Sequence, residues 1–407
     1  MQTKTLIFLG DGMADEPIKE LDGKTPLQAA HTPAMDRIAR EGVSGTLHTL
    51  PEGFPTSSDV ANMSVLGCHI PSDYCGRGPL EAAGRGITLA PDDVAFRINL
   101  TTERDGILTD YSGGHLAQDH ANELIALLND AFGSARVRIE AGVSYRNLLI
   151  LSGPEFTPAL VTAKPDDNQG NRVDEHLPHA DAPEAQETLA LLLKIIREAP
   201  QIMAQSSVNQ ALLAKGQPLL TNGVWPCLGG HAANLTTLKS KYGVENSAVI
   251  SAVDVVLGLG RCLGMELITV PGATGYIDTN YEGKADAAIQ ALETNDFIYL
   301  HVEAIDEVSH EQRLDLKLQA IEDFDRRVVA RVLDGISDDV NVAVLPDHPV
   351  PLSTGKHTRT PVPVSVRRKG HAADTVQTFD EAACLTGELG AMANGDLMAL
   401  LLGAPRV

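Results

Sequence analysis

Short apolar runs alternate along the chain with stretches whose apolar residues repeat at helical spacing. The runs typical of buried strands lie at 5–10, 248–250, 266–270, 297–303 and 341–346. The helical repeats lie at 32–41, 253–263, 284–294 and 313–333. This repeated order of strand and helix predicts an α/β fold, with a mostly parallel sheet covered by helices on both faces.

The segment from about 92 to 185 has a different pattern. Strand-like runs at 94–100, 106–110, 135–140 and 145–151 surround a helical stretch at 116–132. A polar stretch rich in Pro, Asp and His follows at 162–183 and is typical of a loop. We therefore expect an α+β insertion at 92–185 within a core domain formed by 1–90 and 190–407. A helix at 184–197 would return the chain to that core.

Composition narrows the classes of partner. The 407-residue chain has 54 Asp and Glu against 32 Lys and Arg, a formal charge of −22. This balance argues against nucleic acid and anionic membranes, because both need clustered basic side chains. A small anionic substrate stays possible, because a few arginines or metal ions can reverse the local field.

The cellular location is also constrained by sequence. No apolar run reaches the roughly 20 residues of a membrane span. The apolar stretch Leu6–Leu9 is too short for a signal peptide. Five scattered cysteines without a C-x-x-C motif fit reduced thiols. We expect a cytoplasmic protein.

Carboxylates and imidazoles gather just beyond the ends of the predicted strands. The set comprises Asp11, Asp306, His310, Asp347, His348 and His357. Asp306 and His310 are spaced i, i+4, which places both on one face of a helical turn. Singly these residues have simpler explanations, such as a helix N-cap for Asp11 or a surface-loop histidine for His357. Together they suffice for two divalent ions with mixed oxygen and nitrogen ligands, and such two-metal sites serve phosphoryl transfer.

A nucleophile candidate lies in the segment PTSSDVANMSVLG at 55–67. Ser57 or Ser58 lies in a turn that opens a helix. A helix N-terminus favours negative charge and can hold a phosphate, and coordination to a metal would activate a hydroxyl. The alternative is that the serine only caps the helix.

Eight motifs resemble one enzyme family in order along the chain. They are GDGMAD (10–15), SDVANMSVLG (58–67), GRGPLEAAGRGI (76–87), GVSYRNLL (142–149), PGATGYIDTNYEGK (271–284), HVEAIDEVSH (301–310), DH (347–348) and KHTRTPVPV (356–364). The chain resembles the archaeal-type, cofactor-independent phosphoglycerate mutases of the alkaline phosphatase superfamily. The resemblance implies an alkaline phosphatase-like sheet flanked by helices, with an inserted α+β cap that binds substrate.

The resemblance also implies residue roles. Ser58, and not Ser57, would become phosphorylated. One metal ion would be bound by Asp11, Ser58, Asp347 and His348. The other would be bound by Asp306, His310 and His357. The two divalent ions would be manganese, zinc or cobalt, and the residues that hold phosphate or carboxylate would be Asn62, Arg77, Arg146 and Lys284.

The implied activity is an isomerase reaction of glycolysis on a small phosphorylated metabolite. A phosphate of 3-phosphoglycerate moves to Ser58 and returns to another hydroxyl, which gives 2-phosphoglycerate, while the cap excludes water. One segment departs from the mutases, because DYSGGHL (110–116) has Tyr111 and His115 where the family has arginines.

Two alternatives remain at this point. A bacterial clade with a similar segment is proposed to contain homoserine kinases of threonine biosynthesis, which would use the same serine and metals. A non-catalytic metal-binding module is a further alternative. It is disfavoured because the whole ligand set and Ser58 are present together.

Overall fold

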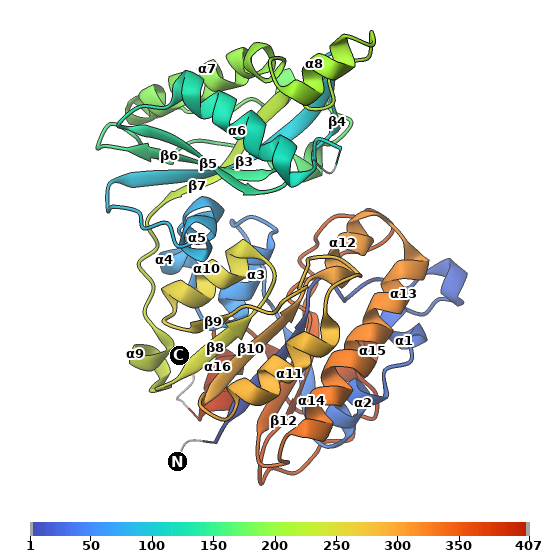
Figure 1. Cartoon of the computed structure of the whole chain (residues 1–407). Helices are drawn as coiled ribbons and strands as arrows, with labels where there is room; N and C mark the ends of the chain where they lie inside the picture. Colours follow the sequence, from blue (N-terminus) through green and yellow to red (C-terminus); the bar gives the residue numbers. More distant parts are fainter. Residues whose placement is uncertain (1–2, 115, 404–407) are drawn as a thin grey trace. The chain divides into compact units, whose positions relative to one another are not determined.

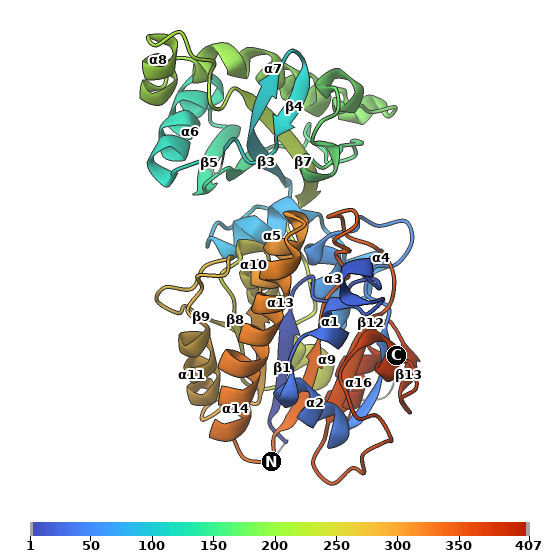
Figure 2. The same ribbon diagram turned by 90° about the vertical axis from the view of Figure 1, so that its right-hand side faces the viewer.

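The computed structural model describes residues 3–114 and 116–403, which form two compact units. The core unit comprises Met1–Tyr74 and Leu235–Val407, and the inserted unit comprises Cys75–Asn234. Figures 1 and 2 show the two units in two views. Within the described residues, no helix combines the length and the hydrophobicity needed to cross a membrane.

The core unit is built on an eight-stranded sheet in the order β13-β2-β12-β11-β1-β10-β8-β9. The strands are β1 (Thr5–Gly10), β2 (Val43–Leu47), β8 (Ser247–Ile250), β9 (Glu266–Ile268), β10 (Phe297–Val302), β11 (Asn341–Leu345), β12 (Val362–Arg367) and β13 (Gly390–Met392). Only β12 runs antiparallel to its neighbours β11 and β2. The predicted α/β class with a mostly parallel sheet is therefore confirmed.

Helices cover both faces of this sheet. One face packs against α2 (Pro33–Arg40), α11 (Tyr281–Ala291), α12 (Ala304–His310), α13 (Leu314–Asp323) and α14 (Ala330–Gly335). The helices α3 (Ser58–Val65) and α10 (Asp254–Cys262) contact each other, and α10 packs on β8. The remaining helices are α1 (Pro26–Ala29), α4 (Ile70–Asp73), α9 (Leu238–Tyr242), α15 (Glu381–Cys384), α16 (Asp396–Leu402) and the 3-10 turn Lys19–Leu21. Because both faces are covered, every residue of β1 and β10 is buried.

The three central strands end at the same edge of the sheet. β1 is parallel to β10 on one side and to β11 on the other. Leu9 is paired with His301 and with Leu345, so the three strands end at one level. The residues that follow them are therefore brought together, although they are some 300 positions apart in sequence.

The helix predicted at 313–333 is interrupted by a π-helical turn. Helix α13 runs into the π-helix η5 (Phe324–Val329), which α14 continues. Asp325 in this turn accepts hydrogen bonds from the backbone N–H groups of Ala34 and Met35 at the start of α2. The turn thus carries the carboxylate that caps a neighbouring helix.

The inserted unit contains a five-stranded antiparallel sheet. Its strands are β3 (Asp93–Arg104), β4 (Ile107–Asp110), β5 (Val137–Val143), β6 (Arg146–Ser152) and β7 (Gly223–His231). Its helices are α5 (Arg77–Gly84), α6 (Gln118–Phe132), α7 (Gln186–Met203) and α8 (Ser207–Leu213). The polar stretch between β6 and α7 contains three short 3-10 turns, at Asp166–Asn168, Val173–His176 and Pro183–Ala185.

The predicted boundaries of the insertion were too narrow. At the N-terminal end, α5 packs on β3 and β7 and so belongs to the inserted unit. At the C-terminal end, β7 pairs with β3. The helix expected to return the chain to the core is α7, and its apolar face packs into the core of the inserted unit instead. The chain rejoins the core unit at Leu235.

Candidate active site

The predicted ligand residues come together at the carboxyl edge of the core sheet. Asp11 follows β1, Asp347 and His348 follow β11, and Asp306 and His310 lie on α12 directly after β10. Among the described residues, four sets of three side chains have donor atoms within 4.8 Å of one another and could hold a metal ion. Two of these sets consist of predicted ligands, Asp11, Asp306 and His348 in one and Asp306, His310 and His357 in the other. The other two sets contain Glu303, either with Asp11 and His301 or with Asp306 and Glu307.

The first group surrounds His348. Its Nε2 atom lies 3.4 Å from Asp11 Oδ1 and 3.3 Å from Asp347 Oδ2. The hydroxyl of Ser58 lies 3.2 Å from the same nitrogen. The four residues assigned to one metal ion by resemblance are therefore adjacent.

The second group surrounds Asp306. His310 Nε2 lies 3.3 Å from Asp306 Oδ2, and His357 Nε2 lies 3.4 Å from Asp306 Oδ1. The two Nε2 atoms are 2.9 Å apart. Two imidazole nitrogens and a carboxylate that converge in this way form a donor set suited to a divalent transition metal. The rings of His357 and His348 stack at 3.7 Å, which makes the two groups contiguous.

A tight backbone approach holds the two groups together. Gly12 has a φ of +65°, and a Cβ added there would lie 2.8 Å from the Cα of Asp306. Its N–H donates to Asp347 Oδ1 at 3.2 Å. A side chain at position 12 would push apart the loops that carry the ligands.

The buried carboxylates of the site have shifted pKa values. Burial and the neighbouring Asp347 raise the pKa of Asp11 well above its usual value, and burial raises the pKa of Asp347 to about 8. At Asp306 burial acts in the same direction, but His310 and His357 hold its pKa well below its usual value. The buried atoms Asp11 Oδ1 and Asp306 Oδ1 accept no hydrogen bond from the described residues. Because buried carboxylates need a compensating charge, this donor set fits divalent metal ions.

The two candidate serines differ clearly. Ser58 is the first residue of α3, and its hydroxyl points at His348. Ser57 occupies the N-cap position, but its side chain makes no capping hydrogen bond, and its buried Oγ has no partner among the described residues. Ser58 is therefore the serine that contacts the ligand groups.

Asn62 has a role that the sequence did not indicate. Its side-chain N–H₂ donates to the carbonyl of Ser58 at 2.8 Å and to Asp347 Oδ2 at 2.9 Å. Its Oδ1 accepts the hydroxyl of Tyr299 at 2.5 Å. Both amide hydrogens are used inside the protein, so Asn62 orients the carboxylate of Asp347 in this structure. The predicted contact of Asn62 with substrate stays a prediction.

Lys284 and two unpredicted residues lie beside the site. The ammonium of Lys284 is buried and donates to the carbonyl of His301 at 3.3 Å, and burial lowers its pKa to about 8. His301 Nε2 lies 2.9 Å from Asp11 Oδ2 and 3.7 Å from Glu303 Oε2. The sequence pattern places His301 and Glu303 in a predicted strand and indicates no role for them. The available signal was that both are polar residues in an otherwise apolar run.

The inserted unit contains a cluster of arginines around one carboxylate. Arg77 Nε lies 2.6 Å from Glu81 Oε1, and Arg97 Nε donates to Asn99 Oδ1 at 2.9 Å. Burial alone would raise the pKa of Glu81, but Arg77, Arg97 and Arg146 lower it below its usual value. Three guanidiniums therefore lie near the carboxylate of Glu81.

Tyr111, one of the two positions that depart from the family, lies near this cluster. The ring of Tyr111 contacts that of Tyr145 edge-on at 5.8 Å, and the guanidinium of Arg146 lies 4.8 Å from the Tyr145 ring. Tyr111 thus packs in an aromatic pair. His115 lies outside the described residues.

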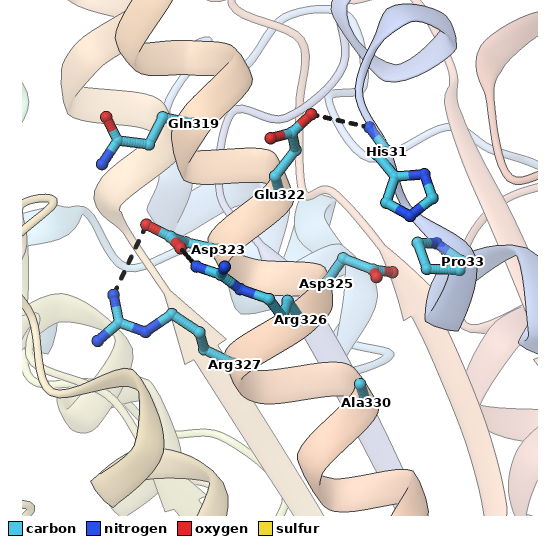
Figure 3. Close-up of a pocket in the computed structure, with 9 residues that line it drawn as sticks. All are labelled: His31, Pro33, Gln319, Glu322, Asp323, Asp325, Arg326, Arg327 and Ala330. Carbon is cyan, nitrogen blue, oxygen red and sulfur yellow. Dashed lines mark hydrogen bonds and ion pairs between the residues drawn. The ribbon is translucent and has the colours of Figure 1, made fainter.

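A separate pocket of about 460 Å³ lies along α13 and η5. Figure 3 shows its lining, which is rich in charged side chains. Arg326 pairs with Asp323 at 2.7 Å, Arg327 pairs with Glu282, and Asp325 caps α2. Its charged groups are engaged in structural contacts, and it shares no residue with the ligand groups.

Comparisons with known proteins agree with this geometry. Residues 39–209 match the family described as 2,3-bisphosphoglycerate-independent phosphoglycerate mutase. A protein of that name from Methanosarcina acetivorans is 43% identical over 403 residues, covering 98% of this chain and 99% of the relative. A probable mutase from Geobacter sulfurreducens is 43% identical over 366 residues, covering 88% of this chain and 89% of the relative.

Solved structures show the same fold. A Pyrococcus horikoshii protein superposes with a TM-score of 0.83 at 26% identity, covering 100% of this chain and 99% of that chain. A cofactor-independent phosphoglycerate mutase from Thermoplasma acidophilum has a TM-score of 0.64 at 27% identity, with 99% of both chains covered.

Proposed function

The chain belongs to the 2,3-bisphosphoglycerate-independent phosphoglycerate mutase family, and we propose that it interconverts 3-phosphoglycerate and 2-phosphoglycerate through a phosphoserine at Ser58. The observation that supports this most directly is the position of the Ser58 hydroxyl. It lies at the start of α3, 3.2 Å from His348, beside the carboxylates of Asp11 and Asp347.

The reaction consists of two phosphoryl transfers. In the first, a bond forms between Ser58 Oγ and phosphorus while the bond from phosphorus to the substrate's C3 oxygen breaks. The C3 oxygen gains a proton and Ser58 loses its own. In the second, the C2 hydroxyl attacks the phosphoserine, and Ser58 regains its proton. No water enters the balance, so the phosphoserine must be protected from hydrolysis.

Two divalent ions, manganese, zinc or cobalt, would complete this site. Asp11, Ser58, Asp347 and His348 would hold one, and Asp306, His310 and His357 would hold the other. When bound, such ions lower the pKa of a coordinated hydroxyl and neutralise the charge that develops on the transferring phosphoryl group. The protein's own part is to present the serine at a helix N-terminus, where backbone N–H groups favour a phosphate.

We further propose that the arginine cluster of the inserted unit binds an anionic group of the substrate. Phosphoglycerate carries a phosphate and a carboxylate, and arginine binds both in a bidentate manner. Arg77, Arg97 and Arg146 all act on the carboxylate of Glu81, which places the three guanidiniums near one another. Lys284 is a less direct candidate, because its ammonium is buried and bonded to a backbone carbonyl.

The relatives favour the mutase over the two alternatives. Proteins 43% identical to this chain over most of its length are named mutases. The homoserine kinase alternative rests on Tyr111 and His115 in the segment 110–116; of these two residues, Tyr111 packs edge-on against Tyr145. The position of the Ser58 hydroxyl beside His348, in the first ligand group, disfavours a non-catalytic module.

Ser58 and Ser57 form a matched pair for the test. Purified protein with Mn²⁺ should convert 3-phosphoglycerate in an enolase-coupled assay, and Ser58→Ala should lower kcat at least a thousandfold. Ser57→Ala should stay within threefold of wild type, because that hydroxyl has no hydrogen-bond partner among the described residues. Mass spectrometry of the acid-quenched enzyme should find phosphate on Ser58. Equal losses from both substitutions, or turnover only with homoserine and a phosphate donor, would overturn the proposal.

A further inference from the structure

Strand β10 carries two polar side chains on one of its buried faces. Tyr299 and His301 are two residues apart, so they point to the same side of the sheet. Both are fully buried, and the strand is otherwise apolar. Because a buried polar group is costly without a partner, the contacts of these two side chains identify their role.

His301 links the end of β8 to Asp11. The N–H of Val253 donates to Ser251 Oγ at 3.1 Å, and this oxygen lies 3.0 Å from His301 Nδ1. The serine hydroxyl can therefore donate to Nδ1, which leaves the proton of the imidazole on Nε2. That N–H then donates to Asp11 Oδ2 at 2.9 Å. The other oxygen, Asp11 Oδ1, faces His348 at 3.4 Å.

Tyr299 links β10 to Asp347 through Asn62. The tyrosine hydroxyl can donate to Asn62 Oδ1 at 2.5 Å, which fixes the orientation of the amide. The amide nitrogen is then directed at Asp347 Oδ2, 2.9 Å away. The plane of this carboxylate is fixed on its other side by the N–H groups of Gly12 and His348, which donate to Oδ1.

We propose that Tyr299 and His301 are positioning residues, which hold the carboxylates of Asp347 and Asp11 in the orientation that binds one metal ion. Outer hydrogen bonds of this kind orient the groups that contact a metal. The second ligand group has separate support, since His310 Nδ1 lies 2.7 Å from the carbonyl oxygen of Gly355. Loss of the Tyr299 or the His301 side chain should therefore weaken the binding of the ion held by Asp11 and Asp347, and leave the binding of the other ion unchanged. The inference rests on the proposed function in that Asp11 and Asp347 bind an ion.

The two sites within one protein allow an internally controlled test. Metal-free protein is titrated with Co²⁺, followed by its visible absorption and by calorimetry. Wild type should bind two ions. Tyr299→Phe and His301→Leu should weaken one of them by about 10–100-fold and leave the affinity for the other within threefold. His301→Gln, which keeps an N–H donor, should restore much of the loss.

Tyr281→Phe is the matched control for Tyr299→Phe. Tyr281 is also fully buried, but it lies on α11 and its hydroxyl has no hydrogen-bond partner among the described residues. Both Co²⁺ affinities of this variant should equal those of wild type. Urea unfolding of each metal-free variant separates a loss of fold from a loss of orientation.

The failures of the two proposals differ in this experiment. The positioning role alone would be overturned by one result. Wild type would bind two Co²⁺ ions, and both Co²⁺ affinities of Tyr299→Phe and of His301→Leu would stay within threefold of the wild-type values. An equal loss of affinity for both ions would also overturn the positioning role, because the substitution would then disturb the whole site and not one pair of carboxylates. Wild type that binds no Co²⁺ would overturn the metal site itself.

Discussion

Lys317 offers a sharp test of how the ligand loops are held. Its side chain on α13 is fully buried, and its ammonium donates to Asp15 Oδ2 at 2.8 Å and to the carbonyl of Val350 at 3.0 Å. Asp15 also accepts the backbone N–H of Leu352. One ammonium thus joins the loop that follows Asp11 to the loop that follows His348.

Substitution Lys317→Met keeps most of the buried stem and removes the charge. Breaking a buried ion pair by removing one partner costs about 3–5 kcal/mol, because the other charge stays buried. Asp15 keeps hydrogen bonds from the N–H groups of Glu16 and Leu352, so we expect the lower end, about 3 kcal/mol. With roughly 2–4 °C per kcal/mol for a domain of this size, the melting temperature should fall by about 6–12 °C.

A double variant tests whether the ion pair between Lys317 and Asp15 causes the expected loss of stability. Lys317→Met combined with Asp15→Asn removes both charges, and its cost in the free energy of unfolding should be smaller than the sum of the two single costs. The matched control is Lys239→Met, which breaks an exposed ion pair with Glu245. Exposed pairs contribute about 0–1 kcal/mol.

Urea unfolding of the metal-free proteins is the measurement. A loss at Lys317→Met no larger than that at Lys239→Met would refute the reasoning, as would strict additivity in the double variant. Mn²⁺ affinity measured on the same proteins should also fall in Lys317→Met, because both loops carry ligands.

Two further predictions concern the rest of the molecule. Burial raises the pKa of Asp325 from 3.8 to about 6. The folded state therefore binds a proton at Asp325 more tightly than the unfolded state does. The stabilisation from this proton is fully present below about pH 4 and is lost as the pH rises through 6. Relative to Asp325→Asn, wild type should lose on the order of 3 kcal/mol of unfolding free energy between pH 4 and 7, and a difference independent of pH would contradict this. Burial also raises the thiol pKa of Cys68, Cys227 and Cys384 to about 12. Iodoacetamide at pH 8 should therefore label the half-buried Cys75 and Cys262 before the buried three, as mass spectrometry can show. Equal labelling of all five would contradict the packing of the buried three.

The core sheet could be predicted because its signals are local. The apolar runs that became β1, β10 and β11 are fully buried strands, and this burial on both faces is what makes each run continuous in the sequence. The positions of Asp11, Asp306 and Asp347 followed from the same logic. Parallel strands end at one edge, so residues after different strands can be expected to meet.

The extent of the inserted unit depended on pairing that no local signal carries. β7 contains Gly and Pro in GVWPCLGGH and does not read as a strand, yet it pairs with β3, more than a hundred residues away. The amphipathic pattern of α7 shows that one face is buried. It does not show against which of two sheets.

The roles of polar residues near the site were decided by contacts distant in sequence. Asn62 lies four residues after Ser58, and its amide contacts Tyr299 and Asp347, which are far from it in sequence. His301 lies in an apolar run, and its partners Ser251 and Asp11 are 50 and 290 positions away. Hydrophobic periodicity can be seen in the sequence, because the buried face of a strand or helix is formed by residues a few positions apart. The partner of a buried polar group is chosen by the packing of separate elements, and therefore emerged only when the chain was folded.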